Sequence, residues 1–224
     1  EVVVMKDYLK QLLQLFRKHY AEHRYAYISL MLGIFGFPLL MAFLTKTAVT
    51  PATMYVAMWL IAIVVTLHIS TSWLRNRYTS ILANTLPVSV GVRYGFILIN
   101  SIVTSALLFF VCYLPSLAIT KVLFPPAPEF DWVFSDIIFL SNYHAYFGIL
   151  GTHAMLLIVN LIGGRRIFIT YLVAILIAIV VQIAIGRYIG IEYRESYKLV
   201  GNILLIFVAW FGGYFILRNY QIRS

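Results

Sequence analysis

Six long apolar runs separated by short gaps constrain the fold of this chain more than any other feature. A helix that rises 1.5 Å per residue needs about 20 apolar residues to cross a hydrocarbon core of about 30 Å. Water does not reach backbone amides in that core, so each span must satisfy its own hydrogen bonds as a helix. The expected spans are residues 26–44, 54–74, 94–119, 137–162, 168–185 and 198–217. The sequence therefore predicts an all-α, polytopic membrane protein, whose transmembrane domain covers residues 26–217.

The distribution of positive charge predicts the orientation of this domain. Hydrophobic residues make up 62% of the chain and charged residues 11%, well below the roughly 25% typical of soluble proteins. Twelve of the 17 lysines and arginines fall in the termini and the even-numbered gaps between spans, and five fall in the odd-numbered gaps. The positive-inside rule then places both termini in the cytoplasm. The net charge of +9 thus reflects membrane topology, and we expect no nucleic-acid partner.

Residues 5–24 predict an amphipathic helix ahead of the first span. Apolar residues recur there at helical spacing, and basic or polar residues occupy the rest of the circumference. The apolar positions are Leu9, Leu12, Leu13, Phe16 and Tyr20. We expect this helix to lie at the cytoplasmic interface, with its rings buried and its amines toward lipid phosphates. A helix docked on a partner protein is the alternative.

The cytoplasmic segment 75–89, between the second and third spans, predicts a rigid corner. Ile81, Leu82 and Leu86 can share one face of a short helix. Pro87 lacks an amide hydrogen and disfavours helical geometry at the preceding residue, so that helix ends there. Ser89 is placed to cap the next helix, which becomes the third span.

The stretch Leu86-Pro87-Val88-Ser89, followed by Tyr94-Gly95-Phe96, resembles the permeases of type-2 ABC exporters. The short subunits from Bacteroidetes-like bacteria are the most similar, and the resemblance extends to the whole layout of an interfacial helix and six spans. It implies that the corner is a coupling helix that seats in a groove of an ATPase subunit. The implied contact residues are Tyr78, Ile81, Leu82, Asn84, Leu86 and Pro87. The gap between the fifth and sixth spans is shorter than in many relatives, so an extracellular gate of the usual size is not expected.

The resemblance also implies the partners and the site of transport. This chain carries no phosphate-binding loop, so ATP and Mg²⁺ would bind to a separate ATP-binding cassette subunit, and this chain would hold no cofactor. A second copy or a homologous permease would complete the complex in the bacterial cytoplasmic (inner) membrane. The implied path residues are Thr66, His68, Ser70, Thr71, Tyr171 and Gln182. No Asp, Glu, Lys or Arg lies in the interior of any span, which favours an amphiphilic, lipid-like or peptide cargo over an ion.

Two other classes of function compete with this interpretation. A membrane subunit that anchors or assembles other proteins, without transport, is the main alternative. An intramembrane enzyme is the other, because His19, Glu22 and His23 match the His-x-x-Glu-His signature of inverted zinc peptidases. No third zinc ligand is evident at that surface, and we expect both histidines on the polar or interfacial face of the basic helix.

Other polar residues inside the spans predict contacts between helices rather than chemistry. Asn142, His144, His153 and Asn160 lie in the fourth span, where interhelical hydrogen bonding is the expected role. A proton or substrate contact from His144 or His153 is the alternative. His144 and His153 fall on opposite faces of that helix, so they cannot form one metal site by themselves. Cys112 is the sole cysteine and is expected to be a small packed hydrophobe.

Overall fold

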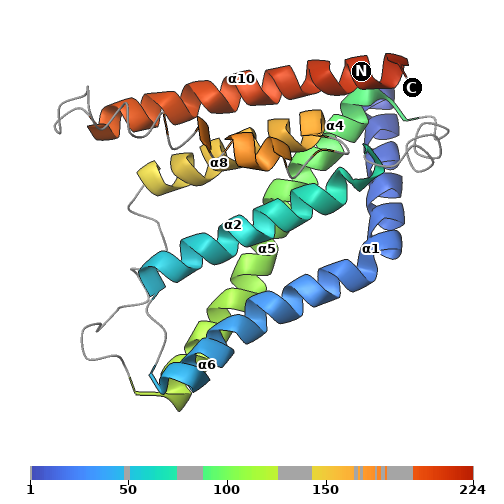
Figure 1. Ribbon diagram of the computed structural model, residues 1–224. Helices are drawn as coiled ribbons and strands as arrows, with labels where there is room; N and C mark the ends of the chain where they lie inside the picture. Colours follow the sequence, from blue (N-terminus) through green and yellow to red (C-terminus); the bar gives the residue numbers. More distant parts are fainter. Residues whose placement is uncertain are drawn as a thin grey trace. The chain divides into compact units, whose positions relative to one another are not determined.

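Helices form every element that the structure describes. The computed structural model describes residues 2–47, 51–74, 88–125, 143–163, 166, 169–174, 176–177, 180 and 194–223, and no strand occurs within these ranges (Figure 1). The all-α prediction is therefore confirmed for the described part of the chain.

Four of the described helices are long and apolar enough to cross a membrane, and they identify a membrane-embedded protein. They cover Asp7–Thr45, Val90–Leu123, Tyr146–Gly163 and Ser196–Asn219. These ranges overlap the expected first, third, fourth and sixth spans. A shorter apolar helix, Met58–Ser70, lies within the expected second span. Much of the expected fifth span, 168–185, falls outside the described residues.

The chain divides into two compact units, and it passes from one to the other within the connection between the expected second and third spans. The first unit comprises Glu1–Ser70 and Gly95–Leu140, and the second comprises Thr71–Tyr94 and Ser141–Ser224. Residues 71–94, which include the corner predicted from the sequence, thus belong with the C-terminal helices.

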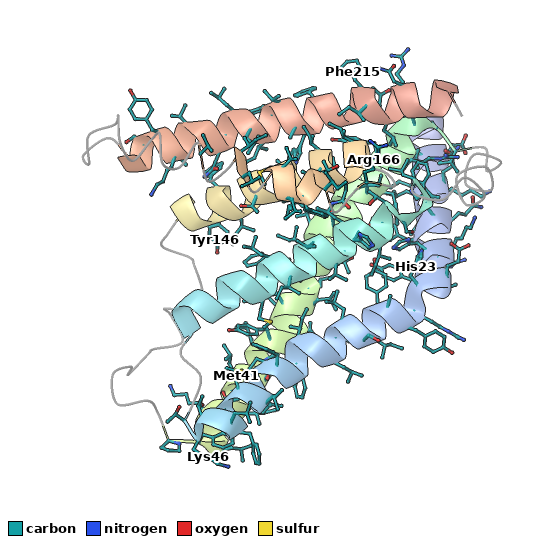
Figure 2. All side chains as sticks on the ribbon, viewed as in Figure 1. His23, Met41, Lys46, Tyr146, Arg166 and Phe215 are labelled. Carbon is teal, nitrogen blue, oxygen red and sulfur yellow. The ribbon has the colours of Figure 1, made fainter. Side chains whose placement is uncertain are left out.

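In the first unit, α1 (Val2–Thr45) is one long helix broken at a single residue. His23 has non-helical angles, φ −110° and ψ 16°, and Figure 2 shows it at the bend. The bend lies next to the boundary expected between the amphipathic segment and the first span. Pro38 lies inside the same helix, but the residue with non-helical angles is His23. At the far end Lys46 follows α1 with φ 59°, the left-handed geometry that often terminates a helix.

The helix that begins at Val90 contains two wide turns. After α4 (Val90–Ile99), the segments η2 (Asn100–Thr104) and η3 (Phe109–Tyr113) are π-helical, separated by α5 (Ser105–Leu108) and followed by α6 (Leu114–Leu123). Pro115 explains the second wide turn, because its ring cannot donate a hydrogen bond and crowds the carbonyl four residues earlier. The first has no proline beside it. It begins at Asn100, whose side chain is fully buried.

Aromatic rings fill much of the core of the first unit. α2 (Pro51–Ser70) contacts η2, α5 and η3, and α1 contacts η3 and α6 (Figure 1). The Phe109 ring stacks on Trp59 at 5.0 Å between centroids and on Tyr113 at 4.8 Å. Cys112 is buried beside them, in agreement with its expected role as a packed hydrophobe.

In the second unit, α8 (Tyr143–Gly163) and α10 (Arg194–Arg223) run side by side (Figure 1). Small residues allow the approach: Ala154 of α8 and Ala209 of α10 are both fully buried in their shared core. At Gly151, an added Cβ would lie 2.7 Å from Asn202 Oδ1 and 3.2 Å from Asn202 Cβ. Phe215 points away from α8 (Figure 2).

Gly151→Ala is expected to destabilise the second unit. Asn202 Cβ is fixed to its backbone, so the new methyl group must push the helices apart, and overpacking of this kind costs about 1–3 kcal/mol. That cost exceeds the gain of about 0.5–1 kcal/mol for alanine over glycine in a helix. Thermal unfolding in detergent micelles, followed by circular dichroism, measures the change.

Gly148→Ala is the matched control on the same helix. An added Cβ at Gly148 meets nothing within 4 Å, so this variant keeps the helix gain without the clash. It should melt at or above the temperature of the parent. Equal melting temperatures for the two variants would contradict the close α8–α10 approach.

Candidate functional site

The six residues proposed to contact an ATPase lie outside the described part of the chain. Tyr78, Ile81, Leu82, Asn84, Leu86 and Pro87 all fall between residues 75 and 87. The structure does describe both ends of the corner: Thr71 to Leu74, including the short 3₁₀ helix η1 (Ser72–Leu74), and Val88 to Tyr94. We call these two ends the corner base.

Ser89 caps the helix that leaves the corner, as its position predicted. The Val92 amide donates a hydrogen bond to Ser89 Oγ at 3.3 Å, and the Arg93 amide donates to the Ser89 carbonyl at 3.1 Å. The helix begins at Val90, directly after the cap. A capping side chain of this kind contributes about 1 kcal/mol to a helix start. The capped start therefore fixes where the corner ends.

A cation–π contact joins the two sides of the corner base. The Arg93 guanidinium lies 5.7 Å from the centre of the Trp73 ring. Arg93 is buried, with 6% of its surface exposed, and desolvated contacts of this type contribute up to about 2 kcal/mol. The end of the incoming segment is thus held against the start of the outgoing helix.

Asn160 of α8 holds the incoming side of the base. Its Oδ1 accepts a hydrogen bond from Thr71 Oγ1 at 3.3 Å, and its Nδ2 donates to the Tyr171 hydroxyl at 2.6 Å. Thr71 and Asn160 are almost completely buried. The expectation that Asn160 bonds between segments is confirmed. Two of the expected path residues, Thr71 and Tyr171, are brought together here.

Tyr94 holds the outgoing side of the base against α10. Its hydroxyl donates a hydrogen bond to the Trp210 carbonyl, and its ring contacts Tyr214 edge to face at 5.9 Å. Gly213 makes room for this ring: an added Cβ would lie 2.8 Å from the Tyr94 hydroxyl and 3.2 Å from Leu161 Cδ1. The ring therefore fits against α10 only because residue 213 has no side chain.

A second polar network surrounds Asn100, within the first unit. Its Oδ1 accepts hydrogen bonds from the Tyr20 hydroxyl at 2.7 Å and from Thr104 Oγ1 at 2.9 Å. Its Nδ2 donates to the Tyr27 hydroxyl at 2.8 Å and to Ser70 Oγ at 2.7 Å. One amide thus joins both arms of α1, the end of α2 and the π-helical turn η2. π-Helical turns recur at functional positions in helices.

The remaining path residues have different surroundings. Thr66 and Ser70 are fully buried, and their hydroxyls donate to carbonyls of their own helix, with Thr66 Oγ1 2.7 Å from the Ala62 carbonyl and Ser70 Oγ 2.6 Å from the Thr66 carbonyl. His68 lies on the exposed side of α2. Gln182 is outside the described residues. Of the five path residues that the structure describes, Thr66, His68 and Ser70 belong to the first unit, and Thr71 and Tyr171 belong to the second.

The placement expected for His19 is wrong. The residue is 8% exposed, its Nε2 is hydrogen-bonded to the Tyr27 hydroxyl at 2.9 Å, and its ring packs against Phe96. The cause is that the amphipathic segment packs along the helix that contains Phe96, so this side of the segment faces protein. Glu22 of the zinc-peptidase motif forms an ion pair with Lys18 at 3.8 Å. Among the described residues, no cluster of three potential metal ligands occurs.

In α8, His153 is buried in the second unit, with its ring edge-on to Trp210. The side chains of Asn142 and His144 lie outside the described residues.

Two residues that organise these networks were missed by the sequence analysis. Asn100 is the only Asn, Gln or His in the expected third span, and an isolated amide in an apolar run is a signal that could have identified it. Tyr94 was noted only as part of a motif, because a tyrosine at a span end usually indicates the membrane interface.

Comparisons with known protein families, with characterised proteins and with solved structures find no match to this chain.

Asn100→Leu is expected to destabilise the first unit. Three hydrogen bonds between the amide and other helices are lost, to Tyr20, Tyr27 and Ser70, and interhelical bonds in membrane proteins contribute about 0.6 kcal/mol each. The free energy of unfolding should therefore fall by about 2 kcal/mol, which a denaturant titration in mixed micelles measures. Asn219→Leu, at an exposed position of α10, is the control and should leave stability unchanged. A loss of the same size in both variants would contradict the role given to Asn100.

Proposed function

We propose that this protein is the membrane-spanning permease subunit of an ATP-driven exporter, driven by a separate ATP-binding cassette subunit. The single observation that carries this proposal is the built corner between α2 and α4. The Leu86-Pro87-Val88-Ser89 motif precedes a helix start that Ser89 caps, and Arg93 closes the base against Trp73.

The membrane arrangement completes the proposal. Six spans, with both termini in the cytoplasm, place the corner on the side where ATP is available. The membrane is then the bacterial cytoplasmic membrane, and residues 5–24 lie at its inner surface. The complex contains either two copies of this chain or one copy and a homologous permease. Four apolar helices of spanning length support this arrangement.

The chemistry of the spans supports an amphiphilic cargo. No Asp, Glu, Lys or Arg lies in the span interiors, and ion pathways usually need intramembrane charges. Thr66, Ser70, Thr71 and Tyr171 offer hydroxyl groups, which suit the polar end of a lipid-like molecule or a peptide. Thr66, Ser70 and Thr71 are fully buried in the present state, so transport requires a rearrangement that exposes them. His68 and Gln182 complete the proposed path.

Leu82→Asp is expected to abolish binding of the ATPase subunit while leaving membrane insertion intact. The new carboxylate would lie at the centre of the apolar face formed with Ile81 and Leu86, where burying an unpaired charge is costly. The measurement is affinity purification of the tagged chain from its native membranes, with mass spectrometry to identify a phosphate-loop ATPase.

Ser80→Asp is the matched control, because residue 80 falls on the opposite face of the same short helix. This variant should retain the ATPase, and its phosphate release in nanodiscs should equal that of the parent. Purification of the parent with no ATPase, but with another membrane protein in fixed ratio, would reject transport and favour the anchoring role.

A further inference from the structure

The corner base is attached at two points to the α8–α10 pair, and this has a mechanical consequence. In the simplest coupling mechanism, a displacement of the corner by a bound partner would tilt only the two helices that the corner connects. The chain does not divide in that way: residues 71–94 belong to the same compact unit as α8 and α10, whereas α2 and residues 95–123 belong to the other unit.

Two independent contacts attach the corner base to α8 and α10. Thr71, one residue after α2, bonds to Asn160 of α8, and Tyr94 bonds to the backbone of α10 at Trp210. The Trp73–Arg93 contact ties the two points together across the base. Thr71 is fully buried and Tyr94 is 7% exposed, so both attachments lie inside the packed unit.

The Tyr94 side chain packs closely against the backbone of α10. The ring lies against Gly213, where an added Cβ would be 2.8 Å from the hydroxyl and 3.2 Å from Cε2 of the ring. The hydroxyl bonds to a backbone carbonyl, so the contact holds the helix axis rather than a mobile side chain. Movement of this end of the base therefore acts on the α10 backbone.

We propose that the corner base, α8 and α10 move as one rigid body, with Tyr94 and Thr71 as the positioning residues that fix the base to the two helices. The rigid body itself follows from the contacts above. The role of this rigid body, which is to transmit a movement of the ATPase subunit to α8 and α10, rests on the proposed function.

The test measures the distance between two spin labels within this body in the full-length protein. Labels at Val88→Cys and Val208→Cys, in a Cys112→Ala background, report on the base and on the exposed face of α10. In nanodiscs without any partner, pulsed electron resonance should give one narrow distance distribution. Thr71→Val with Tyr94→Leu should broaden it to at least about twice the parent's width, because the unattached base samples several positions.

The matched control makes the same two types of substitution within α8 and α10. Thr152→Val alters a hydroxyl that bonds within α8, and Tyr197→Leu alters an exposed tyrosine of α10. This pair should leave the distribution narrow. A broad distribution in the parent, or an equal width in the anchor variant and the parent, would overturn the proposal.

A second pair of variants keeps the test valid if the anchor variant does not fold. Gly213→Ala should broaden the distribution on its own, because its methyl group displaces the Tyr94 ring. Added to Tyr94→Leu, it should cause no further broadening. If the two substitutions broadened the distance distribution independently, that result would contradict the proposed Tyr94–Gly213 contact. Since these measurements need no ATPase, a narrow parent distribution in a protein that binds no ATPase would reject the proposed function and leave the rigid body standing.

Discussion

A polar group inside these apolar helices is costly unless it finds a partner in the protein, and this constraint organises much of the structure. Lipid offers no hydrogen bonds, so an amide or hydroxyl at membrane depth is either paired within the fold or costly. Asn100 and Asn160 each satisfy this constraint by joining separate parts of the chain. Apolar burial holds helices together with little specificity when lipid is the competing environment. The two asparagines therefore help to specify which segments of the chain meet.

Glycine and wide turns complete that specification. Gly151 lets α8 approach Asn202 of α10, and Gly213 lets α10 approach the Tyr94 ring. Both distances are shorter than any side chain at the glycine would allow. The π-helical turn at Asn100 presents that amide to four hydrogen-bonding partners. The kink at His23 turns the N-terminal arm of α1, where Tyr20 reaches Asn100, while Tyr27 beyond the kink reaches the same amide. A single buried residue thus fixes the angle between the two arms.

Sequence reasoning predicted features that depend on local chemistry. The apolar runs predicted helices of membrane-spanning length, and the spacing from Pro87 to Ser89 predicted the capped start of α4, because capping depends on neighbouring residues alone. Sequence reasoning failed where the residue that makes the contact lies far along the chain. Helical periodicity placed His19 on a polar or interfacial face, since nothing nearby in sequence indicates that Phe96 and Tyr27 would cover it. Gly213 likewise shows its role only when Tyr94, 119 residues earlier, lies against it.

The functional account depends on one claim, that the corner between α2 and α4 contacts a separate nucleotide-driven protein in the cytoplasm. A photo-reactive amino acid at position 78 tests this most directly, because it labels whatever lies beside the corner in intact cells. The account predicts that ultraviolet light attaches a phosphate-loop ATPase to this position, and that the yield falls when cellular ATP changes the state of the complex. Attachment to a periplasmic protein, or to lipid alone in a fully assembled complex, would contradict it.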